Sequence, residues 1–316
     1  MTYEQLIKKG SSILSEKEDR FDAESDAWWL FSQAASMDRK EFFLSMKKEA
    51  PAPVEENFMD LIRRRFSMEP VAYILGEWEF MGMPFYTTPA TLIPRQDTET
   101  LVETALAYVD RLVRKHPGEH LRLRILDMCT GSGCIAISMA GFLKEKYGKD
   151  VQYPGAYADE GRENEPPRLE VQVTAVDISQ EALKVARKNA DRNGVDIRFL
   201  RGDMWSALEE GETFDLILSN PPYIDEVQMK TLPEDVANFE PRTALEGGAD
   251  GLDFYRILTA GSGSHLNPGG RVFWEIGDEQ QVSVHTLISR TDNLLWSGCY
   301  TDLTGHDRVV EAEKVG

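Results

Sequence analysis

An asparagine, two prolines and a tyrosine follow the apolar residues 216–219, and together they have the chemistry to hold a planar NH2 group. Because prolines fix φ and lack an N–H, Pro221 and Pro222 leave carbonyl oxygens as acceptors in a rigid turn. A substrate NH2 group could donate one hydrogen to the Asn220 side chain and one to the Pro221 carbonyl, while Tyr223 stacks on its plane. Such a turn suits methyl transfer to an amide or arylamine nitrogen, a weak nucleophile that needs orientation more than a strong base.

A glycine-rich turn upstream has the features of a nucleotide-binding loop. It lies between a short apolar strand, residues 123–126, and a helix that we expect to run to about residue 143. Gly131, Gly133 and Ala136 fit the G-x-G-x-x-G/A pattern, whose small residues let the backbone approach a ligand at a helix N-terminus. The loop formed by Cys129, Thr130, Gly131, Ser132 and Gly133 is therefore a candidate nucleotide-binding loop.

An acid after the second strand fits a ribose. A carboxylate at Asp177 could accept hydrogen bonds from both ribose hydroxyls. It lies 44 residues after Gly133, beyond the usual spacing of ~20, because a charged insertion intervenes. A purely structural alternative is that Asp177 caps the helix that begins near Ser179.

Two further acids and a methionine extend the predicted cofactor site. Asp203, after the third strand, suits the exocyclic amine of adenine, and Met204 could pack on the ring. Asp127 could orient the loop or a positively charged cofactor. These features fit either a dinucleotide or S-adenosylmethionine, and the loop alone does not separate them. The turn at Asn220 favours S-adenosylmethionine, because it suits methyl transfer to nitrogen. A dinucleotide-dependent dehydrogenase is disfavoured, because no general acid for hydride chemistry is placed near the loop.

The elements that must position these residues form two regions and a linker. Residues 1–70 carry apolar side chains at helical spacing, such as the stripe that begins at Phe58, which predicts a small helical bundle. Residues 71–94 mix aromatic and β-branched residues with Gly and Pro, so we expect a β-hairpin linker. Residues 95–316 form the third region, in which the charged residues 144–168 read as a surface insertion.

In this third region, predicted strands alternate with predicted helices. Such alternation implies an α/β fold with a parallel sheet covered by helices on both faces. The strand candidates are residues 123–126, 169–176, 197–200, 216–219 and 271–276. The helix candidates are residues 101–113, a helix ending near 143, 181–193 and 254–260.

The motifs together resemble a known family. The Asn-Pro-Pro-Tyr run at 220–223, with "LDMCTGSG" and "AVDIS" before it, resembles class I S-adenosylmethionine-dependent methyltransferases that modify amide or amino nitrogen. The stretches "TPATLIPRQDTETLVE" at 88–103, "NFEPRTALEGGADGLDFYR" at 238–256 and "DLTGHDRVV" at 302–310 closely resemble the PrmC/HemK family, the peptide chain release factor glutamine methyltransferases. The resemblance covers about residues 69–310, preceded by a helical N-terminal region in the expected place.

The resemblance implies a Rossmann-like, seven-stranded methyltransferase domain, a helical substrate-recognition domain and the cofactor S-adenosylmethionine. The substrate would be the glutamine of the Gly-Gly-Gln motif in class 1 release factors. The loop from Cys129 to Gly133 would meet the methionine end of the cofactor, Asp177 the ribose and Met204 the adenine. Asn220, near the cofactor, would hold the glutamine together with Pro221, Pro222 and Tyr223. The active site would be framed by Arg95, Asp97, Thr98 and Glu99.

One position departs from the family pattern. The family often has glycine where this chain has Cys129. A backbone contact from this residue survives the change if its φ stays negative.

Three rival functions share parts of this pattern. A nucleic-acid N6-adenine methyltransferase could use the same turn, but residues 225–250 hold seven acids and two bases, which would repel a phosphate backbone. A glutamine methyltransferase of a ribosomal protein has a similar fold, and "IPRQDTE" favours the release-factor branch. A catalytically silent cofactor-binding protein would not need Asn220, Pro221 and Tyr223 intact.

Composition limits the setting. The 316 residues carry 54 acids against 35 Lys and Arg, a formal net charge of −19, so we expect no direct nucleic-acid partner. The three cysteines suit core thiols in a reducing compartment, and neither they nor the five histidines show metal-ligand spacing. No signal-peptide or membrane-spanning run is evident, which predicts a soluble, cytoplasmic protein. We also expect a monomer that holds no metal.

Overall fold

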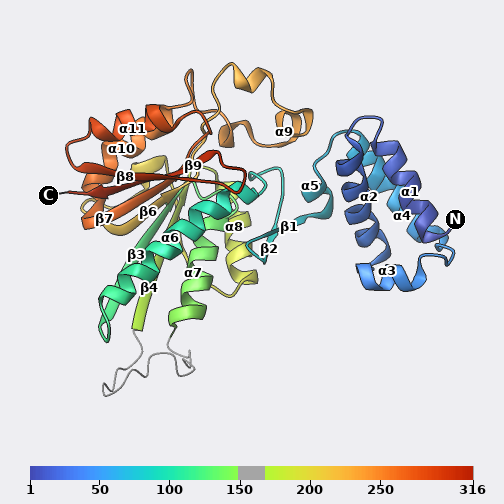
Figure 1. The fold of residues 1–316 in the computed structure, drawn as a ribbon, viewed down its shortest axis with the longest axis horizontal. Coiled ribbons are helices and arrows are strands. Elements are labelled where there is room, and N and C mark those ends of the chain that lie inside the picture. The colour runs from blue at the N-terminus through green and yellow to red at the C-terminus, as the bar shows by residue number, and fades with distance from the viewer. Residues whose placement is uncertain (149–167, 316) are drawn as a thin grey trace. The chain divides into compact units, whose positions relative to one another are not determined.

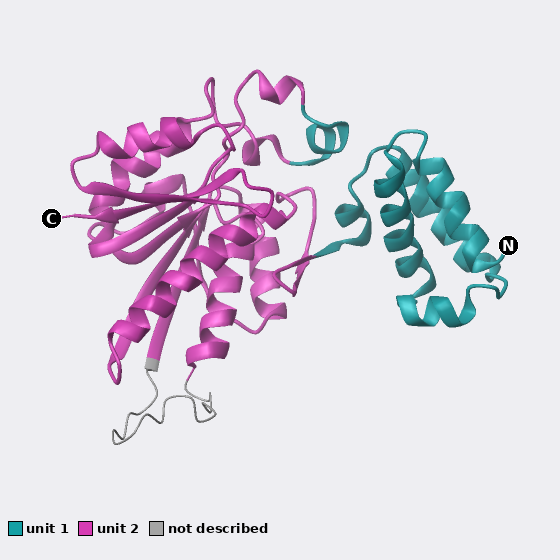
Figure 2. Cartoon of the chain, viewed as in Figure 1, with its two compact units in different colours: residues 1–78, 232–240 teal, residues 79–231, 241–316 magenta. Residues whose placement is uncertain are grey.

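The computed structural model describes residues 1–148 and 168–315. The chain forms two compact units, coloured separately in Figure 2. The helical unit comprises residues 1–78 and 232–240, and the sheet unit comprises residues 79–231 and 241–316. Within the described ranges, no helix is long and apolar enough to cross a membrane.

The helical unit packs amphipathic helices around a core that contains Leu6, Phe31 and Phe58. Side chains at the N-caps start three helices, because Thr2, Asp19 and Asp38 accept hydrogen bonds from the free backbone N–H groups of the first turn. The helices of this unit are α1 (Tyr3–Leu14), α2 (Arg20–Ala35), α3 (Arg39–Ser45), α4 (Ala52–Phe66), α5 (Val71–Leu75) and α9 (Glu234–Phe239).

The segment predicted as a hairpin linker is only partly strand. Residues 71–75 form α5, which Pro70 starts and Gly76 ends with a left-handed φ of +76°. Within 71–94 the strand pair consists of β1 (Glu77–Phe80) and β2 (Met83–Tyr86). Proline before a helix and glycine after it are strong boundary signals, and here they override the local strand pattern.

The sheet unit is built on one mixed sheet of seven described strands, in the order β5-β4-β3-β6-β7-β9-β8 (Figure 1). The strands are β3 (His120–Met128), β4 (Arg168–Asp177), β5 (Arg198–Arg201), β6 (Phe214–Ser219), β7 (Leu266–Glu275), β8 (Leu294–Thr301) and β9 (Asp307–Lys314). The first five pair in parallel.

The predicted parallel sheet is extended at one side by an antiparallel pair of strands. The strand β9 runs antiparallel to both β7 and β8. A short connection, residues 302–306, joins β8 to β9, and so short a connection can only make a hairpin. The seven-stranded sheet that the family resemblance implies is confirmed.

Helices cover both faces of this sheet. Successive residues of β6 point to opposite faces, so Leu216 and Leu218 pack with α6 (Gln96–Lys115) and α7 (Cys134–Tyr147). Ile217 packs on the other face with α10 (Asp253–His265) and α11 (Gln281–Ser289). The helix α8 (Gln180–Arg192) contributes Ala190 to the first of these two cores.

The predicted insertion is shorter than residues 144–168. Residues 144–147 belong to the last turn of α7, and Arg168 begins β4. The rest of the predicted insertion, residues 149–167, lies outside the described residues.

Topology brings the two predicted motifs together. The chain passes from β3 outward to β4 and β5, then returns to β6 on the other side of β3. The carboxyl ends of β3 and β6 therefore flank the point where strand order reverses, which is where open α/β sheets bind ligands. The glycine-rich loop follows β3 and the Asn-Pro-Pro-Tyr turn follows β6.

Candidate active site

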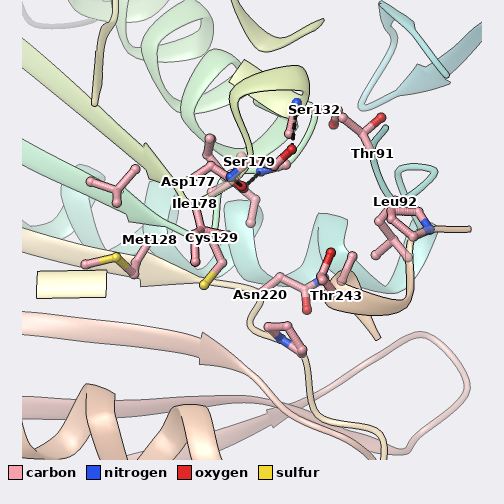
Figure 3. A pocket seen from close by; sticks show the side chains of 18 of the residues that line it. Thr91, Leu92, Met128, Cys129, Ser132, Asp177, Ile178, Ser179, Asn220 and Thr243 are labelled. Atoms are coloured by element: carbon pink, nitrogen blue, oxygen red, sulfur yellow. Dashed lines mark hydrogen bonds between the residues drawn. The ribbon is translucent and has the colours of Figure 1, made fainter. Parts of the chain in front are cut away.

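A cavity of about 320 Å³ opens at this edge of the sheet unit (Figure 3). Its wall includes most of the residues that the sequence predicts for the cofactor and the substrate. Those that line it are Cys129, Thr130, Gly131, Ser132, Asp177, Asp203, Met204, Asn220 and Pro222. Three predicted site residues, Gly133, Pro221 and Tyr223, are not part of the wall.

The glycine-rich loop takes a conformation that needs its glycines. Gly133 is the N-cap of α7 with φ +83°, and a Cβ there would lie 2.9 Å from the Ile137 Cδ1 atom and 3.2 Å from the Ala186 Cβ atom. Gly131 has φ +54°, and nothing lies within 4 Å of its Cβ position. Gly133 therefore allows α7 to approach α8, while Gly131 turns the loop toward the cavity.

Asp127 anchors this loop through two hydrogen bonds. Its Oδ2 atom accepts hydrogen bonds from Thr130 Oγ1 at 2.5 Å and from the Ala136 N–H at 3.2 Å. The residue is fully buried, and burial raises its pKa to about 7. Because Asp127 does not line the cavity, the structure favours the first of its two predicted roles, orienting the loop.

Two cavity residues have strained backbones. Cys129 has φ +63° and Met204 has φ +47°, so the condition of a negative φ at Cys129 is not met. Left-handed conformations cost non-glycine residues roughly 1–2 kcal/mol, and the strain explains why glycine suits position 129. The Cys129 Sγ and Met204 Sδ atoms lie 3.6 Å apart. Burial raises the pKa of the Cys129 thiol, so it is protonated at neutral pH and is no nucleophile.

Asp177 lines the cavity and also bonds to the backbone around it. Its Oδ1 atom accepts the Ser179 N–H and its Oδ2 atom accepts the Gly131 N–H, both at 2.8 Å. These bonds tie the end of β4 to the glycine-rich loop and to the start of α8. The Ile178 backbone also bonds to this carboxylate. A carboxylate has about four acceptor positions, so one remains for a hydroxyl group in the cavity.

The Asn-Pro-Pro-Tyr turn presents Asn220 to the cavity. The Asn220 Nδ2 atom donates to Thr98 Oγ1 at 3.1 Å, so the amide oxygen is the atom left for a ligand. The Tyr223 carbonyl accepts a hydrogen bond from Gln280 Nε2 at 2.9 Å, which anchors the turn. The Tyr223 side chain is largely buried, and burial raises its pKa.

The four residues predicted to frame the site separate into two pairs. Arg95 and Thr98 line the cavity. Asp97 forms an ion pair with Arg308, 3.5 Å between Oδ2 and Nη2. Glu99 accepts the Met81 N–H at 2.7 Å, which ties α6 to the turn between β1 and β2. At the start of α6, Arg95 and Thr98 therefore contribute to the cavity wall, whereas Asp97 and Glu99 bind neighbouring parts of the fold.

Sequence reasoning missed a large part of the wall. The segment 90–94 lines one part of the cavity, and a second segment that includes Pro241, Thr243 and Glu246 lines another. The backbone of Ile224 bonds to Leu245 and Gly247, which holds this second segment beside the turn after β6. Both segments fall within the stretches 88–103 and 238–256 that carry the family resemblance, and that was the available signal.

The wall suits a cofactor with a ribose, an adenine and a cationic centre. Its charged residues are Asp177, Asp203 and Glu246 against Arg95, so the cavity favours positive charge. Carboxylates accept from hydroxyl and amino groups, and the loop after β3 lets a ligand approach its backbone. Mixed sheet order, loop and turn together define a class I S-adenosylmethionine-dependent methyltransferase, and S-adenosylmethionine is the cofactor.

Known proteins narrow the class. Residues 5–76 match the family model described as PrmC N-terminal domain, and residues 163–237 match the one described as methyltransferase small domain. A release factor glutamine methyltransferase of Geobacter sulfurreducens is 37% identical over 284 residues, covering 89% of this chain and 86% of the relative. One from Clostridium acetobutylicum is 35% identical over 325 residues and covers 100% of both chains.

The chain belongs to the release factor glutamine methyltransferase family. Among solved structures, the release factor-specific protein-(glutamine-N5) methyltransferase from Alicyclobacillus acidocaldarius is 29% identical. The comparison covers 73% of this chain and 100% of that chain, with a TM-score of 0.36.

Proposed function

We propose that this enzyme transfers a methyl group from S-adenosylmethionine to the side-chain amide nitrogen, N5, of the glutamine in the Gly-Gly-Gln motif of class 1 release factors. One observation carries the proposal: Asn220 lies in the cavity wall with its Nδ2 atom bound to Thr98, which leaves its oxygen for a substrate NH2 group. The two relatives described above, both named release factor glutamine methyltransferase, support the choice of glutamine and of the release factor.

The cofactor would be held by the loop after β3 and by the acids after β4 and β5. Residues 129–132 and Asp177 line the cavity, and Met204 offers an apolar surface for the adenine. When bound, S-adenosylmethionine supplies an electrophilic methyl group on a sulfonium.

The glutamine amide would be oriented by two acceptors. The Asn220 Oδ1 atom, in the cavity wall, would accept one hydrogen of the substrate NH2. The carbonyl of Pro221, which lies outside the wall, is predicted to accept the other, and the two bonds would fix the direction of the nitrogen lone pair. Orientation of this kind can supply about 7–11 kcal/mol of a barrier. Burial raises the pKa of the Cys129 thiol, so it is protonated at neutral pH and offers no nucleophile. We propose that the proton lost from the substrate nitrogen passes to solvent. Tyr223 supports the turn, and stacking on the substrate stays a prediction.

The helical unit is proposed to recognise the release factor. Its α2 and α3 expose large apolar side chains, with Phe21 80%, Phe43 65% and Leu44 78% exposed. Exposed apolar residues of this size suit a protein partner better than a nucleic acid. A monomer is proposed because one chain supplies the whole cavity wall, and the cytoplasm is proposed because release factors act there.

The test is methyl transfer to a matched pair of substrates. The enzyme is incubated with labelled S-adenosylmethionine and either a class 1 release factor or the same factor with its Gly-Gly-Gln glutamine changed to alanine. Label on the first protein alone is the expected result. Label on neither, with cofactor binding intact, would refute the release-factor assignment and direct the search to ribosomal proteins or to adenine in nucleic acids.

A further inference from the structure

A buried acid beside the cavity has no part in the function proposed above. Glu275 is the last residue of β7, and only 1% of its surface is exposed. Among the described residues, its Oε2 atom has no hydrogen-bond partner. A buried carboxyl with unmet hydrogen-bonding capacity is costly to keep, so its place in the fold needs a reason.

Glu275 is connected to the substrate-binding amide through one hydroxyl group. Thr98, which is 2% exposed, makes a side-chain hydrogen bond to the Glu275 carboxyl. The Asn220 Nδ2 atom donates to the Oγ1 atom of the same threonine at 3.1 Å. Three elements therefore meet at this hydroxyl: the end of β7, the first turn of α6 and the turn after β6.

The direction of the Thr98 hydroxyl decides the direction of the Asn220 amide. A hydroxyl has a single hydrogen to donate. When Glu275 is ionised it can only accept, so Thr98 donates to Glu275 and can only accept from Asn220. The NH2 of Asn220 then points to Thr98 and its oxygen points to the cavity.

We propose that Glu275 is a positioning residue, which through the Thr98 hydroxyl holds the Asn220 side-chain oxygen toward the substrate nitrogen. The proposal rests on the proposed function for the identity of that nitrogen. The orientation of the amide itself depends only on the contacts within this chain.

Loss of the negative charge on Glu275 would reverse the chain of bonds. A protonated Glu275, or a glutamine at this position, can donate to Thr98 Oγ1. The Thr98 hydrogen is then free to donate to Asn220 Oδ1, and the amide turns round. Its NH2 would face the NH2 of the substrate, and two donors cannot bond to each other.

The surroundings place this change near neutral pH. The pKa of Glu275 is raised to about 7, chiefly by burial and also by the negative charge of Asp97. The hydrogen bond from Thr98, the charge of Arg308 on β9 and the Tyr223 hydroxyl act in the opposite direction. The other titratable groups that feel Glu275 are the Tyr255 hydroxyl of α10 and the Cys134 thiol of α7, and burial raises the pKa of both, so they stay neutral.

The first test is an NMR titration of the full chain with 15N-labelled asparagine, which needs no substrate. The side-chain NH2 resonance of Asn220 is followed from about pH 5.5 to pH 8.5. We expect a transition near pH 7 that is lost in Glu275→Gln and kept in Glu212→Gln, a buried acid bound to Arg124 and Arg198 away from the cavity. No transition in the natural chain, or one that persists in Glu275→Gln, overturns the proposal.

The second test uses variants of the relay and single-turnover methylation. Thr98→Val removes the hydroxyl and should abolish the Asn220 transition, whereas Thr98→Ser keeps the hydroxyl and should keep the transition. This pair of variants tests the role of the hydroxyl even if Glu275→Gln does not fold. With the release factor as substrate, Glu275→Gln should lower the turnover rate about tenfold, as expected for one misdirected hydrogen bond, with unchanged affinity for S-adenosylmethionine. A natural chain that methylates no release factor refutes the proposed function, while the amide titration still decides the role of Glu275.

Discussion

Alanine at Gly133 should damage the sheet unit more than alanine at Gly131. Both glycines have a left-handed φ, +83° and +54°, which costs an alanine roughly 1–2 kcal/mol. Only Gly133 also faces close neighbours, with Ile137 Cδ1 at 2.9 Å and Ala186 Cβ at 3.2 Å from the added methyl. Overpacking of this kind costs about 1–3 kcal/mol more.

The expected loss is therefore about 2–5 kcal/mol for Gly133→Ala and about 1–2 kcal/mol for Gly131→Ala. For a unit of this size, each kcal/mol lowers Tm by about 2–4 °C. Thermal unfolding of the full chain, followed by tryptophan fluorescence and far-UV circular dichroism, measures the two shifts side by side.

The comparison isolates the close packing of α7 on α8, because the two variants share the added methyl and the unfavourable φ. A Tm for Gly133→Ala equal to or above that of Gly131→Ala would refute the reasoning. In that case the loop must relax without cost, and its glycine would not be needed for the approach of the helices.

Three other substitutions test the remaining contacts. Asp177→Ala should weaken S-adenosylmethionine binding by more than tenfold in calorimetry, because it frees the Gly131 N–H and removes the ribose acceptor; unchanged affinity would contradict its role. Burial raises the pKa of Asp127 to about 7, above ~3.9 in an unfolded chain, so the folded state binds more protons and stability falls from about pH 4 to pH 7. Asp127→Asn should make that fall shallower in urea unfolding at pH 5 and pH 8, and an equal slope would count against the assignment. Arg65→Met should destabilise the helical unit by about 3–5 kcal/mol, because it leaves the buried Glu18 carboxylate, 2.7 Å from Arg65 Nε, without its ion-pair partner. Hydrogen exchange in α1, α2 and α4 measures the loss, and a change below about 1 kcal/mol would contradict the importance of this ion pair.

The central strands of the sheet could be predicted because each is a nearly continuous apolar run. Residues 216–219 and 271–276 read as buried strands; the first range lies in β6, and the second matches β7 up to Glu275. The last two strands of the chain, β8 and β9, could not be predicted in this way. Gly298 lies at an irregularity in the pairing of β8, and β9 carries buried charge, with Glu311 bound to Arg271 of β7. Ion pairs across strands make a buried strand look polar in sequence.

The site could be predicted where its residues are local in sequence. The glycine-rich loop and the Asn-Pro-Pro-Tyr turn each occupy a few adjacent residues that follow a strand, and the order of strands brings them together. Glu275 could not be recognised from sequence, because its role depends on Thr98, which is far away in the chain and adjacent only in the folded structure. Pro241 and Thr243 likewise reach the cavity only through the bridge between Ile224 and Glu246.

The most direct test of the central claim is single-turnover methylation of a class 1 release factor by Asn220→Ala, with the affinity for S-adenosylmethionine measured on the same preparation. The account predicts a rate lower by on the order of 10²–10³, the usual effect of losing one preorganised polar group at a reacting centre. It also predicts a cofactor affinity within about threefold of the natural enzyme, because the loop after β3 and Asp177 are untouched. A rate equal to that of the natural enzyme would contradict the claim that this amide holds the substrate nitrogen.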